Sequence, residues 1–148
     1  TLSAEVGTGG LFVTESDGLV VDTVAAVTVD RVKTDGTVTA STVTDAALSD
    51  LTSLGAVVLQ TTNGSITTEE TNGDISAAGN ILLKAGETAA ATVAGITLNA
   101  TVSTKVGSAG NISLIAADSV SQSGGGDITA DGAELLTPQS PSIDHPFG

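Results

Sequence analysis

The sequence contains no cysteine, methionine, tryptophan or tyrosine, and its only aromatic residues are two phenylalanines. Without cysteine there are no disulfides and no thiol chemistry, so any core must be held together by packing. Only four of the 148 residues are lysine or arginine, against 17 acidic residues, which gives a formal net charge of −13. Nucleic-acid phosphates attract basic side chains, so this composition argues against DNA or RNA as a partner.

Long apolar segments are missing as well. No stretch approaches the run of about 18 apolar residues that a membrane-spanning helix needs, so we expect no insertion into a bilayer. The chain begins at Thr1 with neither a methionine nor a signal peptide, which indicates that it is matured or cut from a longer chain. An acidic, soluble surface is typical of secreted or surface-exposed proteins.

The residues that are present favour β-structure. Hydrophobic residues make up 40% of the chain and are valine, isoleucine, leucine and alanine almost throughout. Threonine and serine are abundant, and the β-branched residues suit pleated surfaces. A mean hydropathy of +0.32 with only 14% charged residues argues against disorder. The composition therefore predicts an all-β fold with a thin aliphatic core.

A short motif recurs, in which glycine and a small or polar residue precede isoleucine or valine. Isoleucines form a series with a step of about 15–16 residues: Ile66, Ile81, Ile96, Ile112 and Ile128. The N-terminal half has a second rhythm, with a step of about 18–19 residues: Gly18, Gly36, Gly55 and Gly73. Fixed short periods are typical of repeat architectures, and these predict coils of about 15–19 residues with the isoleucines stacked inward.

Two architectures are compatible with this pattern. The repeated aliphatic positions favour a parallel β-solenoid, in which equivalent residues stack one coil apart. The alternative is an antiparallel β-sandwich, because the Asn-Gly and Asp-Gly dipeptides are also hairpin signals. Residues 45–54 have leucines every third position and are interpreted as a helical turn or, in keeping with the repeats, an irregular coil. We assign residues 1–136 to the repeat domain and 137–148, which hold all three prolines, to an extended C-terminal arm or linker.

Four segments share a repeated style of sequence: Gly-Gly-Leu-Phe-Val-Thr-Glu-Ser-Asp-Gly-Leu at 9–19, Thr-Thr-Asn-Gly-Ser-Ile-Thr at 61–67, Gly-Asn-Ile-Leu-Leu-Lys-Ala-Gly at 79–86 and Gly-Asn-Ile-Ser-Leu-Ile-Ala-Ala-Asp at 110–118. These segments resemble the repeat regions of giant bacterial surface proteins of the filamentous-haemagglutinin-like kind. The resemblance covers most of residues 9–132. It implies a right-handed parallel β-helix in a long secreted protein that serves as adhesin, matrix or surface layer. It carries no site residues.

The sequence gives little support for catalysis. Enzymes built on β-helices use carboxylate pairs or basic residues in a groove, and aromatic rings that stack on sugars. This chain has no tyrosine or tryptophan, and its one histidine, His145, lies in the proline-rich tail. We therefore expect no enzyme activity and no organic cofactor. The candidate metal ligands are Asp17 and Asp35, because a coil of about 18 residues would stack them where Ca²⁺ could offset their repulsion.

The remaining candidates concern assembly. Leu2 and Val6 lie in an alternating segment that reads as a strand able to pair with a neighbour, and Ile143 and Phe147 are apolar residues of the C-terminal tail. Stacks of coils end in open strand edges. The sequence thus predicts a structural, extracellular or cell-surface protein that associates with itself, head to tail, into a filament, matrix or coat. The alternative is an adhesin module that binds a glycan or a protein through one face.

Overall fold

The computed structural model describes residues 1–39, 44–88, 93–105 and 109–136. All regular structure in these ranges is β, as the composition predicts, and no helix occurs in them. Within the described part of the chain there is accordingly no helix long and apolar enough to cross a membrane.

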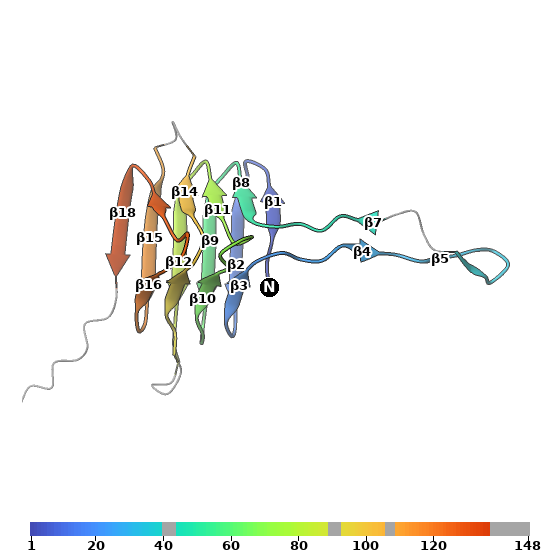
Figure 1. Cartoon of the computed structure of the whole chain (residues 1–148), viewed down its shortest axis with the longest axis horizontal. Coiled ribbons are helices and arrows are strands. Elements are labelled where there is room, and N and C mark those ends of the chain that lie inside the picture. Colours follow the sequence, from blue (N-terminus) through green and yellow to red (C-terminus); the bar gives the residue numbers. More distant parts are fainter. Residues whose placement is uncertain (40–43, 89–92, 106–108, 137–148) are drawn as a thin grey trace, which may run out of the picture.

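Three parallel sheets account for most of the chain (Figure 1). Sheet 1 consists of β1 (Ala4–Val6), β8 (Leu51–Ser53), β11 (Ile75–Ala77), β14 (Val102–Thr104) and β17 (Ile128–Thr129). Sheet 2 consists of β2 (Leu11–Glu15), β9 (Val57–Thr61), β12 (Ile81–Ala85), β15 (Asn111–Ala116) and β18 (Gly132–Leu136). Sheet 3 consists of β3 (Leu19–Val21), β10 (Ile66–Thr68), β13 (Ile96–Leu98) and β16 (Val120–Gln122).

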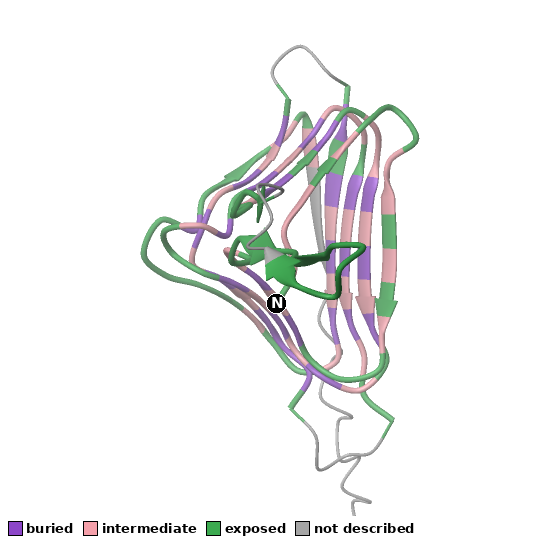
Figure 2. Cartoon of the chain, turned by 90° about the vertical axis from the view of Figure 1, so that its right-hand side faces the viewer, coloured by how far each residue is buried: buried purple, intermediate pink, exposed green. Residues whose placement is uncertain are grey.

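The chain visits the sheets in a fixed order, 1, 2, 3 and then 1 again, and each such passage is here called a circuit. Viewed along the stacking direction, the circuits superimpose into a triangle with one sheet on each side (Figure 2). Every strand pair within the three sheets is parallel. The antiparallel sandwich is therefore wrong. Its Asn-Gly and Asp-Gly signals mark corners of the triangle and the tip of one hairpin.

The circuits are longer than the sequence periods suggested. Ile66 pairs with Ile96 in sheet 3, whereas Ile81 pairs with Ile112 in sheet 2. After the first circuit, register partners in successive circuits are thus separated by roughly 20–30 residues, a usual length for one structural repeat. The predicted single isoleucine column is in fact two interleaved columns, and Ile128 belongs to sheet 1. The predicted coil length is wrong because a circuit carries one inward isoleucine in sheet 2 and another in sheet 3. The spacing between successive isoleucines is therefore shorter than the full circuit.

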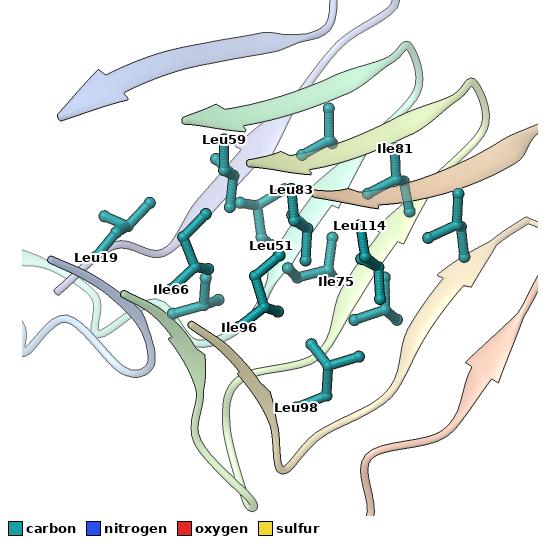
Figure 3. Packing of buried hydrophobic residues seen from close by; sticks show 14 of the residues in the cluster. Leu19, Leu51, Leu59, Ile66, Ile75, Ile81, Leu83, Ile96, Leu98 and Leu114 are labelled. Carbon is teal, nitrogen blue, oxygen red and sulfur yellow. The ribbon is translucent and has the colours of Figure 1, made fainter. Parts of the chain in front are cut away.

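The interior is filled by aliphatic side chains that point inward from all three sheets (Figure 3). The prediction that Ile81, Ile96 and Ile112 face inward is confirmed, since each has at most 1% of its surface exposed. The sheet strands alternate buried and outward residues, as a pleated strand requires. Because each strand stacks on its equivalent, each inward column continues the same core from circuit to circuit.

One segment leaves this stack. After β3 the described residues 24–39 and 44–48 form a long antiparallel hairpin, and the segment 24–48 is here called the hairpin arm. Its described strands are β4 (Val27–Thr28), β5 (Arg31–Val32), β6 (Val38–Thr39) and β7 (Thr44–Asp45), and a bridge between Val24 and Leu48 closes its base. Figure 1 shows the hairpin arm extending from the β1 end of the stack, along the stacking direction. Residues 45–54 form neither a helical turn nor a plain coil but the return of this arm and β8.

The hairpin arm makes the first circuit the longest. Ala4 of β1 pairs with Leu51 of β8, and Leu11 of β2 pairs with Val57 of β9. The chain thus leaves the stack for the whole length of the hairpin arm and still returns to the register that the later circuits keep.

Replacing the buried Ile96 with aspartate should destabilise the fold strongly. The Ile96 side chain is fully buried, so Ile96→Asp places an unpaired carboxylate in an aliphatic core and should lower the free energy of unfolding by about 3–5 kcal/mol. The matched control is Thr97→Asp, on the same strand but facing outward, which should cost less than about 1 kcal/mol. Thermal and urea unfolding measure both. Equal stability of the two variants would contradict the inward assignment.

The hairpin arm should be dispensable for folding. The corners that follow β10, β13 and β16 need six, three and five residues to pass from sheet 3 to sheet 1. Replacing residues 24–48 with a single glycine leaves five residues between Val21 and Leu51, within that range. The free energy of unfolding should change by no more than about 1 kcal/mol, because closure cost varies slowly with loop length. Circular dichroism and urea titration test this, and an unfolded deletion variant would show that the hairpin arm supports the stack.

Candidate functional site: outer faces, ends and hairpin arm

Two of the three outer faces carry mostly small hydroxyl side chains. The central residues of the sheet 1 strands form one outward column, and those of the sheet 3 strands form another. The Ser121 hydroxyl donates to the Thr97 hydroxyl at 3.2 Å. These faces are polar and well solvated. The columns are Glu5, Thr52, Ser76, Ser103 and Thr129 in sheet 1, and Val20, Thr67, Thr97 and Ser121 in sheet 3.

The outer face of sheet 2 is different. Its outward columns bring Phe12, Val58 and Leu82 side by side on β2, β9 and β12, with Ile115 on the neighbouring β15. Phe12 is 68% exposed, which is unusual for the only aromatic ring in the described part of the chain. On these four strands Lys84 is the one charged residue that faces outward. Val58, Leu82 and Ile115 are half-buried, and together with the exposed Phe12 they form an apolar patch of the kind that often marks an interaction surface.

The N-terminal end of the stack is bounded by β1, β2 and β3. Val6 lies in β1, which pairs with β8 of the same chain. The Leu2 amide donates to the Val20 carbonyl at 2.7 Å, and the Leu2 carbonyl accepts from the Asp22 amide at 3.1 Å. Leu2 also packs against the core. Both predicted assembly residues are thus engaged within their own chain, and β1 is an outer strand of its sheet, with no described strand pairing its other edge.

The other two predicted assembly residues, Ile143 and Phe147, lie outside the described residues, as does His145. At this end β16, β17 and β18 are the last strands of their sheets. The stack therefore has parallel strand edges at both ends, and the edges are of opposite kind. An assembly of copies that joins one end to the other would be heterologous, with different surfaces of the two copies in contact.

The predicted calcium pair is not brought together. Asp17 lies in the corner between β2 and β3, beside Gly64 of the next circuit. Asp35 lies at the far tip of the hairpin arm, between β5 and β6 (Figure 1). The sequence spacing that paired them is not a circuit, because the chain leaves the stack between the two residues. No cluster of three or more acidic or histidine side chains suited to a metal ion occurs in the residues described.

Each of these aspartates sits in a local turn. The Thr37 hydroxyl donates to Asp35 Oδ1 at 2.6 Å, and the Thr37 amide donates to the same oxygen at 3.0 Å. These bonds hold the pKa of Asp35 below its usual value. The Asp17 amide donates to Glu15 Oε2 at 2.6 Å. Both arrangements are those of side chains that stabilise tight turns.

Polar ladders at two corners of the triangle were not found from the sequence. The Asp74 amide donates to Asp50 Oδ1 at 3.1 Å, and the Thr101 amide donates to Asp74 Oδ1 at 2.8 Å. At another corner the Asn111 amide donates to Asn80 Oδ1 at 2.9 Å. Each ladder residue immediately precedes the first inward residue of a strand. The two Gly-Asn-Ile motifs contained the sequence signal for the asparagine ladder. Their isoleucines, Ile81 and Ile112, pair with each other across a full circuit, and neither pairs with Ile96, which lies between them in the sequence.

Glycine precedes asparagine in that motif because the backbones approach closely. A Cβ added to Gly79 would lie 2.9 Å from the Ala56 nitrogen, and one added to Gly110 would lie 2.7 Å from the Gly79 carbonyl oxygen. The Gly79 amide also donates to the Gly55 carbonyl at 3.1 Å. The motif therefore serves stacking and not ligand binding.

Comparisons with known protein families, with curated proteins and with solved structures found no match to this chain. Any functional role must therefore be inferred from the surfaces described above and from the sequence.

Gly79→Ala should weaken the stack. The added methyl group meets backbone atoms of the previous circuit, which have little freedom to move, so the free energy of unfolding should fall by about 1–3 kcal/mol. Gly7→Ala is the matched control, because a Cβ at Gly7 would have no heavy atom within 4 Å. Urea unfolding of the two variants provides the measurement. If Gly79→Ala is as stable as Gly7→Ala, close stacking at this corner is not a constraint.

Proposed function

We propose that this chain is a segment of a right-handed parallel β-solenoid, and that it serves as a structural repeat protein outside the bacterial cell or on its surface. In this proposal copies associate head to tail into a filament, a matrix or a surface coat. The observation that carries the proposal is the stacking of three parallel sheets in one continuous register, with the end strands of each sheet paired on one side only in the described residues, apart from the bridge of Leu2 to Val21 on the outer edge of β3.

The physical support is that such a stack has no intrinsic end. A parallel edge strand presents unpaired amide and carbonyl groups with which another strand can form hydrogen bonds. Natural proteins cover such edges or pair them with another chain. In the described residues neither end carries a capping helix. The two ends are of opposite kind, so joining them is heterologous, and joining that continues the stack along its own axis favours an open polymer.

The proposed location outside the cell or on its surface is supported by separate observations. The high negative charge keeps copies soluble and disfavours nucleic acid. The resemblance of residues 9–132 to filamentous-haemagglutinin-like repeat regions points to an extracellular or cell-surface role. Both points come from the sequence alone, and the location stays a prediction.

One observation favours the alternative, a binding module. The exposed Phe12 with Val58 and Leu82 on the sheet 2 face is the kind of localised apolar surface that a module binding a glycan or a protein would present. A purely structural stack does not need it. The two proposals therefore differ in the surface that is used: the ends of the stack, which meet another copy, in the first, and this outer face, which meets a different molecule, in the second.

Head-to-tail assembly predicts that the purified chain sediments as larger species as its concentration rises, and that negative-stain images show elongated particles. A chain truncated after Leu136 tests the contribution of the C-terminal tail with its Ile143 and Phe147, and it should form shorter polymers or none. Light scattering at matched concentrations compares the two. A full-length chain that stays monomeric at high concentration would overturn the assembly proposal, while equal polymers from both chains would leave the tail a linker.

A further inference from the structure

The hairpin arm is an exposed ribbon without a partner in the described part of its own chain. Every residue of it whose burial the structure describes is exposed, from residue 24 to 38 and from 44 to 48. Its apolar side chains are exposed to an unusual degree: Val27 55%, Val29 58%, Val32 67% and Val38 61%. A two-stranded hairpin alone in water is marginally stable. Val32 and Val38 are register partners and therefore lie on the same face of the hairpin. This exposed apolar pair indicates a surface that is covered when the protein acts.

The direction of the hairpin arm decides which molecule covers it. Figure 1 shows it pointing away from all three sheets, and Figure 2, viewed along the stack, shows it within the outline of the triangle. It cannot pack on the outer faces of its own chain in this arrangement. A copy placed squarely on the same end would meet it head on, whereas a copy displaced to one side would meet it along its length.

The sheet 2 face has matching chemistry and size. It is the most apolar of the three outer faces: one outward column holds Phe12, Val58 and Leu82 before Ser113, and the other holds Thr14, Gln60, Lys84 and Ile115. Its five strands span about 19 Å and the segment 24–36 spans about 40 Å, so the hairpin arm is long enough to cross the whole face. Its strands run along the stacking direction, nearly perpendicular to those of sheet 2. Such crossing sheets pack through side chains and not through strand edges.

Charge favours the same contact. Between residues 24 and 48 three aspartates are offset by Arg31 and Lys33, which gives a net charge of −1, so the rest of the chain carries −12 of the total of −13. Contacts between two stacks would bring strongly acidic surfaces together. A contact between the nearly neutral hairpin arm and strands β2, β9, β12 and β15, whose one outward charge is Lys84, avoids most of this repulsion.

We propose that the hairpin arm of one copy packs across the outer face of sheet 2 of a second copy. This inference rests on the proposed head-to-tail assembly, but it places the contact between copies on the hairpin arm and an outer face and not on the strand edges. The copies are staggered, each displaced sideways from the next, and the contact is heterologous. When successive copies keep the same orientation, such a contact propagates as an open polymer and does not close into a ring. The sheet 2 face covers roughly 300 Å² by its dimensions, less than half of the area per partner in a standard stable interface. A single contact is accordingly weak, and assembly depends on concentration.

The first test compares variants of the two surfaces. A chain with Val27→Thr, Val32→Thr and Val38→Thr, here called the valine variant, keeps the β-branched shape of the hairpin arm but removes its apolar surface. Phe12→Ser alters the other side of the contact. Each should raise the concentration needed for assembly at least tenfold in sedimentation velocity. Val93→Thr is the control, because Val93 is 73% exposed and lies on neither surface, and it should assemble like the original chain.

The second test is a disulfide between copies, which the absence of native cysteine makes unambiguous. A chain with Val32→Cys is mixed with a chain with Leu82→Cys under mild oxidation. We expect a mixed dimer in excess of that formed when Val93→Cys replaces Leu82→Cys, because a disulfide needs Cα atoms within about 7 Å. Unchanged circular dichroism confirms that each variant is folded.

The outcomes separate this inference from the proposed function. If the original chain assembles and the valine variant assembles equally well, with no excess of mixed disulfide, the contact is elsewhere and the inference is overturned, while head-to-tail assembly stands. If Phe12→Ser weakens assembly but the valine variant does not, the sheet 2 face meets another part of the partner, and the inference again fails. If the original chain does not assemble at all, both proposals fail together.

Discussion

The structure depends on the close, in-register stacking of one circuit on the next. Adjacent strands in a sheet lie about 4.8 Å apart, and this spacing is held in all three sheets at once. Corner residues must therefore be small, as Gly79 and Gly110 are, or must bond to the next circuit, as Asp74 and Asn80 do. Any residue that interfered with this spacing at one corner would part the strands on both adjoining sides.

The same constraint explains the composition. Inward columns are built from leucine, isoleucine and valine because the triangular interior is narrow and continuous, and the described core contains no aromatic ring. Outward positions are free of this demand. They carry hydroxyls on two faces and an apolar patch around Phe12 on the third, and this difference gives the molecule distinct sides. A stack with distinct sides and unlike ends is polar along its axis. This polarity suits a head-to-tail polymer better than an isologous dimer.

The hairpin arm occurs at a corner, where the stacking rule is least strict. Corners after the first circuit already vary in length between sheets 3 and 1, so an insertion there leaves the register of the three sheets intact. Asp50, with a φ of 63°, is where the chain returns to the stack, and its carboxylate then starts the ladder that continues through Asp74. The stack thus tolerates a long projecting element without loss of its own contacts, and this element is available for interaction.

Much of the fold could be predicted from the sequence, and the limit has a physical cause. Composition and alternation determined an all-β chain with an inward aliphatic core, and Ile81, Ile96 and Ile112 were correctly placed in it, because burial and pleat are properties of each strand. The length of a circuit, the separation of neighbouring isoleucines into different sheets and the projection of residues 24–48 were decided only by the tertiary structure. The inward isoleucines of two sheets give the same local pattern, and only the pairing of strands a full circuit apart distinguishes them. Asp17 and Asp35 show the same limit, because a regular spacing along the chain places two side chains together only if the chain between them stays in the stack.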